Sequence, residues 1–108
     1  MSLATRVWVD AYRRRIEQGG AFAHVARKGD GENGAVLVRV ATMDGRAALY
    51  QRSFDLMSGT RAWVELATGT EAEMEAATAR QAGFDPDLWV VEVEDPHGRH
   101  LLDDPSLA

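Results

Sequence analysis

Residues 84–95, FDPDLWVVEVED, form the stretch that decides the fold. Asp-Pro-Asp is typical of a turn, because proline fixes a backbone dihedral angle and aspartate accepts hydrogen bonds from nearby backbone N–H groups. Leu-Trp-Val-Val-Glu-Val follows as a run of strand length that is rich in β-branched and aromatic residues. We therefore predict a strand at residues 88–94 in the interior of one small sheet.

Length and composition indicate a single globular domain over residues 1–108. Apolar residues at 45% and charged residues at 27% are ordinary values for a folded chain. The chain has no cysteine, which excludes disulfides, thiolate nucleophiles and cysteine-bound zinc. No apolar run approaches the roughly 18 residues of a membrane span, and the first residues lack the apolar core of a signal peptide. We expect a cytoplasmic protein that does not enter the membrane.

The net charge of −5 is divided unevenly along the chain. Residues 1–52 carry nine Lys/Arg and five Asp/Glu, whereas residues 53–108 carry three and twelve. Because the acidic half would repel a phosphate backbone, we do not expect nucleic-acid binding. The run Arg13–Arg15 does not change this expectation, since consecutive helical residues point in different directions. Opposite charges in the two halves are compatible with an unknown protein partner or with self-association.

Two segments have helical patterns. Residues 5–18 place Trp8, Tyr12 and Ile16 four residues apart, which predicts an apolar stripe on one helix face, and Gly19-Gly20 follows. The second helix is expected to begin after Thr70, because Thr70-x-x-Glu73 has the spacing of a capping box. We expect this helix to end at Ala82, with Gly83 adopting the left-handed conformation that follows many helices.

The remaining segments alternate as strands do, and Asp44-Gly45 predicts a hairpin between two of them. We expect the first three strands to form an antiparallel meander, with a tight turn at residues 29–34. A short edge strand is expected at 99–102, followed by a frayed tail at 103–108. The five main strands are predicted at residues 21–27, 35–41, 47–53, 61–67 and 88–94.

These elements predict an α+β fold in the order α-β-β-β-β-α-β(-β), with two helices on one face of a mostly antiparallel sheet of about five strands. The core is predicted from residues whose side chains repeat on one face of their element. They are Trp8, Tyr12, Ile16, Phe22, Val36, Val38, Leu49, Val64, Phe84, Trp89, Val91 and Val93.

Three blocks of the sequence carry a family resemblance. They are WVDA at residues 8–11 with Arg13-Arg14, GAVLV at 34–38, and the block from Arg80 to His100 that contains RQ, FDPDLW, EVE and GRH. These blocks resemble DUF1491, a family of short alphaproteobacterial proteins, over nearly the whole chain. The resemblance implies a self-standing cytosolic bacterial domain. It implies no catalytic residue, because the activity of that family is unknown.

Metal-ligand residue types gather near the end of the chain. His97-x-x-His100 followed by Asp103 and Asp104 could hold a metal ion if the two imidazoles converged on it. The alternative is that both histidines are solvent-exposed residues of a turn. His24 lies far from this cluster in the sequence, so we do not include it.

Carboxylates flank the strand at residues 88–94. Asp85, Asp87, Glu92 and Glu94 resemble the acidic strand of metal-dependent nucleases, and Arg99 and His100 follow them. However, Glu94 is followed by Asp95-Pro96 and not by the basic residue that such a site needs. Alternation along the strand predicts instead a solvated face at Glu92 and Glu94. We retain these six residues as candidate ligand-binding residues.

The sequence supports a binding or interaction domain without catalysis of its own, and self-association as a homodimer is one form of that hypothesis. No cofactor is expected, because Asp30–Gly34 lacks both the spacing of a calcium loop and the lysine of a phosphate-binding loop. The alternative is a metal-dependent hydrolase or nuclease that uses the Asp, Glu and His residues of the C-terminal block. No complete catalytic constellation is recognised.

Overall fold

A computed structural model describes residues 3–108. The described residues form two α-helices, α1 (Thr5–Gln18) and α2 (Glu71–Phe84), and five strands. The strands are β1 (Phe22–Arg27), β2 (Val36–Ala41), β3 (Arg46–Asp55), β4 (Thr60–Thr70) and β5 (Trp89–Glu94). The predicted element order is confirmed. No helix among the described residues is long and apolar enough to cross a membrane.

The five strands form one mixed sheet in the order β1-β5-β2-β3-β4. β2 and β5 are parallel, and the other three pairings are antiparallel. The predicted meander of the first three strands is therefore wrong at its start, because β5 lies between β1 and β2. Residues 89–91 of β5 are apolar on both faces, and an interior position buries both. Residues 28–35 accordingly form a connection across the end of β5, where Asp30 N donates to Asp87 O, and do not form a hairpin turn.

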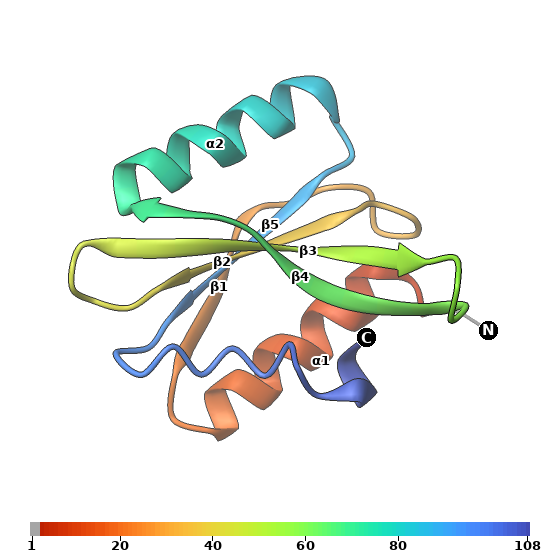
Figure 1. Cartoon of the computed structure of the whole chain (residues 1–108), viewed down its shortest axis with the longest axis horizontal. Coiled ribbons are helices and arrows are strands. Elements are labelled where there is room, and N and C mark those ends of the chain that lie inside the picture. Colours follow the sequence, from red (N-terminus) through yellow and green to blue (C-terminus); the bar gives the residue numbers. More distant parts are fainter. Residues whose placement is uncertain (1–2) are drawn as a thin grey trace.

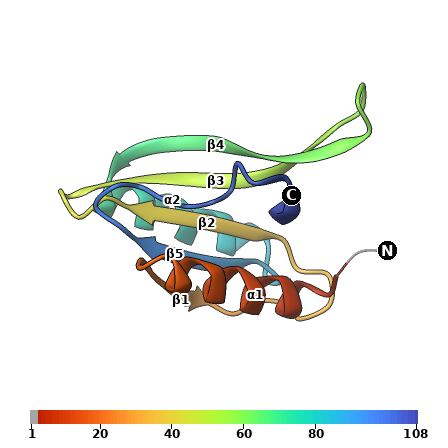
Figure 2. The same ribbon diagram turned by 90° about the horizontal axis from the view of Figure 1, so that it is seen from below.

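The two helices lie on opposite faces of the sheet, which corrects the prediction of one covered face (Figures 1 and 2). α1 packs on Trp89, Val91 and Val93 of β5. α2 covers the other face, where Ala82 contacts the cluster that contains Leu88 and Val90. Apolar side chains at the start of β5 point alternately to the two faces of the sheet. A single layer of helices would cover one face and leave the apolar side chains of the other face in water.

The helix ends have local causes. α2 begins with the predicted capping box, in which Glu73 N donates to Thr70 Oγ1 and Thr70 N donates to Glu73 Oε1. Its predicted end at Ala82 is wrong, since the helix continues through Gly83 to Phe84. It stops there because Asp85 is extended ahead of Pro86, and a residue before proline disfavours the helical conformation.

Most of the predicted core is buried under α1. The buried residues of that prediction are Trp8, Tyr12, Ile16, Val38, Leu49, Trp89, Val91 and Val93, and Val36 is partly buried. Three predictions are wrong, because Phe22 is 72% exposed, Phe84 86% and Val64 39%. Phe22 lies on the outer face of edge strand β1, where Ala23 faces inward. Phe84 is the last residue of α2, and Val64 lies on edge strand β4.

The distal part of β3 and β4, here called the arm (residues 52–63), projects beyond the rest of the sheet (Figure 2). β2 begins at Val36, and its register pairs Leu37 with Gln51. β3 continues to Asp55, past the start of β2. The tip of the arm exposes Phe54, Leu56 and Met57.

The chain end is packed and not frayed. Residues 99–102 form no strand, and Pro105–Leu107 form a short 3₁₀ helix. Leu102 and Leu107 are both buried in the cluster beneath α1. These two leucines fix the segment because their side chains complete the apolar layer between α1 and the arm.

Candidate functional site

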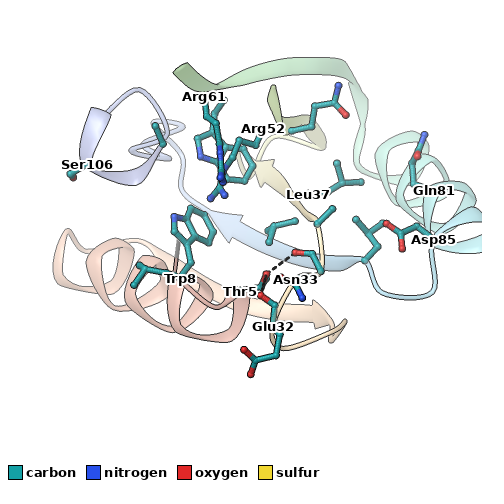
Figure 3. A pocket seen from close by; sticks show the side chains of 18 residues that line it. Thr5, Trp8, Glu32, Asn33, Leu37, Arg52, Arg61, Gln81, Asp85 and Ser106 are labelled. Atoms are coloured by element: carbon teal, nitrogen blue, oxygen red, sulfur yellow. Dashed lines mark hydrogen bonds between the residues drawn. The ribbon is translucent and has the colours of Figure 1, made fainter. Parts of the chain in front are cut away.

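A cleft of about 770 Å³ opens where the arm leaves the sheet (Figure 3). It is lined by residues from α1, from the loop before β2, from β3 and β4, from the end of α2 and from the chain end. We call it the arm cleft. It exists because β3 and β4 continue past the first residue of β2, so the space beside them is bounded by loops and by helix ends.

Two tryptophans form one wall of the arm cleft. The rings of Trp8 and Trp63 stack with centroids 5.2 Å apart, and Trp8 also stacks on Tyr12 at 4.9 Å. Both indole N–H groups donate to the carbonyl oxygen of Leu107, at 3.2 Å from Trp8 and 3.0 Å from Trp63. The packed chain end therefore holds the aromatic wall in place.

Arg52 lies against this wall. Its guanidinium carbon is 5.1 Å from the ring centroid of Trp8 and 5.1 Å from that of Trp63, within the range of a cation–π contact. Its Nε is buried and, among the described residues, has no hydrogen-bond partner. Burial lowers the pKa of Arg52, and the nearby positive charge of Arg61 adds to this effect. A half-buried cation that lies on two ring faces and retains an unpaired donor at Nε favours an anionic ligand.

The rest of the cleft rim is polar and partly acidic. Glu32 and Asp85 line it away from the two arginines, as Figure 3 shows. Glu32 is paired with Arg6. Asp85 Oδ1 accepts a hydrogen bond from Asp87 N at 3.0 Å and so braces the turn into β5. The cleft thus carries cations at the arm and carboxylates at the opposite rim.

The candidate residues from the sequence are divided between two places. Asp85 and Asp87 lie in the turn before β5, and only Asp85 lines the arm cleft. Glu92 and Glu94 lie on the α2 face of β5, where Arg39 donates to Glu92 from Nε at 2.8 Å. The histidine next to Glu92 and Glu94 is His24 of β1. Neither His97 nor His100 belongs to this group among the described residues.

Arg99 has a structural partner. Its backbone N, Nε and Nη2 donate to the carboxylate of Asp95 at 2.7, 2.9 and 3.0 Å. The carboxylate is only 1% exposed, and the hydrogen bonds from Arg99 hold the pKa of Asp95 well below its usual range. Gly98 N also donates to Asp95 O at 3.0 Å, the hydrogen bond of a reverse turn. This cluster closes the turn after β5.

The two C-terminal histidines do not form a joint site among the described residues. His97 is exposed in the turn. His100 packs its ring on Tyr50, 4.5 Å between centroids, and its Nδ1 accepts a hydrogen bond from Leu102 N at 2.9 Å. Burial lowers the pKa of His100, which favours the neutral imidazole. The carbonyl oxygen of His100 accepts a hydrogen bond from the hydroxyl of Tyr12 at 2.7 Å. His100 therefore joins the C-terminal segment to α1.

Sequence reasoning missed Arg52, Trp63 and His24. Arg52 lies two residues after Tyr50 and therefore on the same, inward face of β3. An arginine on an inward face is the sequence feature that identifies Arg52 as a candidate. The distance of His24 from the other candidates along the chain gives no signal of its position, since residues remote in sequence become neighbours when their strands pair.

Comparison with known proteins identifies the family. The family described as "Protein of unknown function (DUF1491)" matches residues 3–103. No curated protein matches the chain. A crystal structure of a DUF1491 family protein from Caulobacter crescentus CB15 is similar, with 46% identity, a TM-score of 0.87, and coverage of 96% of this chain and 98% of that one.

Two further solved structures agree. An NMR structure of a DUF1491 family protein from the same organism has 48% identity and a TM-score of 0.82, and covers 97% of this chain and 96% of that one. A solution structure of a protein from A. tumefaciens has 36% identity and a TM-score of 0.74, and covers 87% and 86%. This chain belongs to the DUF1491 family, whose function is unknown.

Proposed function

We propose that this protein is an interaction domain without catalysis of its own, and that its arm cleft binds an acidic peptide segment of a partner protein. The proposal rests on Arg52, whose guanidinium lies on the aromatic wall. Its buried Nε has no hydrogen-bond partner among the described residues. A carboxylate in the cleft would accept that donor and form a charge-assisted hydrogen bond.

The backbone beside Arg52 favours an extended ligand. Residues 53–55 of β3 run past the start of β2, and no strand pairs with them on that side within the part of the chain that the structure describes. A peptide that continues the line of β2 could add to this edge through main-chain hydrogen bonds, while its side chains enter the cleft.

The tip of the arm adds an apolar contact surface. Leu56 is 86% exposed and Met57 96%, and Phe54 lies beside them on β3. Large apolar side chains gathered at one tip are a common feature of interaction surfaces. An acidic peptide with apolar residues on one flank fits the arm and the cleft together.

Selection of short random peptides displayed on phage tests this proposal. We expect enriched peptides to carry Asp or Glu, and to bind the Arg52→Met variant about tenfold or more weakly, because a hydrogen bond to a charged group contributes about 1.5–3 kcal/mol. Trp8 and Trp63 provide a fluorescence signal for binding. Arg14→Met is the matched control, since Arg14 pairs with Asp10 on the exposed side of α1. Equal binding by Arg52→Met and the wild type would reject the proposal.

Self-association is a second candidate, and edge strand β4 favours it. β4 is 11 residues long, it is the last strand of the sheet, and it exposes Val64 and Leu66. A second copy of the chain could pair along this edge. Sedimentation equilibrium at micromolar concentration is expected to show a dimer that Val64→Lys converts to a monomer. A monomeric wild-type protein would contradict this candidate.

The hydrolase or nuclease alternative has less structural support. It requires His97 or His100 to meet Asp85 or Glu92 in one cleft. Asp85 lines the arm cleft and Glu92 lines a separate, smaller one, and neither cleft is lined by His97 or His100. The cytoplasmic location stays a prediction, which fractionation of the native host would test.

A further inference from the structure

The smaller cleft, on the opposite face of the sheet from α1, gathers metal-ligand side chains. β1 and β5 pair antiparallel, with Phe22 opposite Glu94 and His24 opposite Glu92. Glu92 and Glu94 are two residues apart on one strand, so their side chains share a face. His24 points to the same face from the neighbouring strand. This pairing brings three ligand side chains from two strands to one place.

The distances suit one ion. His24 Nε2 is 3.9 Å from Glu92 Oε1, and His24 Nδ1 is 4.0 Å from Glu94 Oε1. One ligand atom from each of the three residues can be chosen so that all lie within 4.8 Å of one another. In a tetrahedral zinc site, bonds of about 2.0–2.2 Å place neighbouring ligand atoms roughly 3.3 Å apart. Closing this difference requires rotation of both the His24 ring and the Glu94 side chain, which are 52% and 34% exposed.

Glu92 is already held in position. Arg39 donates to Glu92 Oε2 from Nε at 2.8 Å and from Nη2 at 2.5 Å, and its Nη1 donates to Thr78 Oγ1 at 3.0 Å. These contacts use Oε2 and leave Oε1 directed towards His24. A hydrogen-bonded partner that orients a carboxylate in this way is typical of metal ligands.

The surrounding charge attracts a cation. The cleft has a volume of about 250 Å³, and Glu71 and Glu75 of α2 line it together with His24, Arg39 and Glu92. With Glu94, four carboxylates face one arginine and one histidine. Glu94 and His24 are 34% and 52% exposed at the side chain, so water can complete the coordination sphere.

We propose that His24, Glu92 and Glu94 bind one divalent transition-metal ion, with zinc as the best match to one imidazole and two carboxylates. The site is independent of the arm cleft and of its ligand. The competing arrangement is an imidazolium that bridges the two carboxylates, because the two ring nitrogens of His24 face different glutamates.

Isothermal titration of the full chain, freed of metal, with zinc chloride tests the proposal. We expect one site per chain, with affinity reduced at least tenfold in both His24→Ala and Glu94→Gln. His97→Ala is the matched control, since His97 is exposed and lies outside the cluster. Glu94→Gln is preferred to a change at Glu92, because it leaves the Arg39 contact intact.

Two results would overturn the proposal. One is the absence of zinc-dependent heat in the wild type. The other is an equal loss of affinity in His97→Ala and His24→Ala, which would indicate binding at dispersed surface histidines. Nuclear magnetic resonance of the imidazole nitrogens gives an independent measurement. Zinc is expected to shift one ring nitrogen of His24, and a His24 ring that keeps the spectrum of an imidazolium at saturating zinc would favour the bridging arrangement.

Discussion

The part of the sheet that the helices cover and the arm differ in how far their side chains are buried. α1 covers one face of the sheet over β1, β5 and β2, α2 covers the other face over β2, β3 and β4, and most side chains beneath the two helices are buried (Figure 1). The arm extends beyond both helices and exposes Phe54, Leu56 and Met57, while Arg52 at its base holds a buried donor without a partner among the described residues. We propose that the covered strands supply stability, and that the arm and its cleft supply recognition.

The largest loss of stability is expected from Trp89→Ala. Trp89 is buried at the centre of the covered part, and its indole N–H donates to Asp30 O at 2.7 Å. Truncation removes apolar contacts and leaves a cavity. It also leaves the carbonyl oxygen of Asp30 without the hydrogen bond from the indole. The free energy of unfolding in urea should fall by about 3–5 kcal/mol. A fall below about 1 kcal/mol would show that this side chain is not part of the core.

Leu107→Ala tests the junction between the two regions. Its side chain is buried beneath α1, and its carbonyl accepts both indole N–H groups of the aromatic wall. Because the chain end can relax, we expect the lower end of the range for buried leucines, about 2 kcal/mol. Tryptophan fluorescence should change with it, since Trp8 and Trp63 lose their packing. Leu3→Ala, at a 63% exposed leucine, is the control and should have little effect.

Asp95→Asn tests the turn after β5 through its pH dependence. The pKa of Asp95 is lower in the folded protein than in the unfolded chain, because Arg99 donates to the carboxylate. Its contribution to stability is therefore complete above the unfolded value of about 3.8 and is lost as the pH falls towards the folded value. The urea concentration at the unfolding midpoint of the wild type should decrease as the pH is lowered below about 4. Asp95→Asn should make this midpoint depend less on pH.

The smallest effect on stability is expected for exposed apolar residues. Phe84→Ser should change the free energy of unfolding by less than about 0.5 kcal/mol, because the ring already lies in water. Leu56→Ser at the tip of the arm should be equally neutral for stability and should weaken binding of the selected acidic peptides. Stability and binding are thus separated, and a large loss of stability in Leu56→Ser would contradict the division between the two regions.

Local signals explain which parts of the fold the sequence predicted. The Trp8, Tyr12 and Ile16 stripe, the Thr70–Glu73 capping box and the turn at Asp44-Gly45 each depend on residues close in the chain, and the structure contains all three features. The strand at residues 88–94 was recognisable for the same reason, because β-branched and aromatic residues run through it.

Long-range pairing explains what the sequence did not predict. Nothing near Phe22–Arg27 indicates that this strand pairs with β5 and not with β2, and that pairing alone brings His24 to Glu92. The arm cleft likewise depends on how far β3 runs past Val36, which is a property of the assembled sheet. Glu92 and Glu94 were identified as candidates, but their neighbours His24 and Arg39 come from other strands.

A double-mutant cycle on the arm cleft tests the central claim most directly. The affinity of a selected acidic peptide and of its Asp→Asn or Glu→Gln counterpart would be measured by tryptophan fluorescence for the wild type and for Arg52→Met. We predict a coupling free energy of about 1.5 kcal/mol or more between Arg52 and the peptide carboxylate. A coupling within about 0.5 kcal/mol of zero would show that the two groups do not interact, and would contradict the assignment of the cleft as a site for acidic peptides.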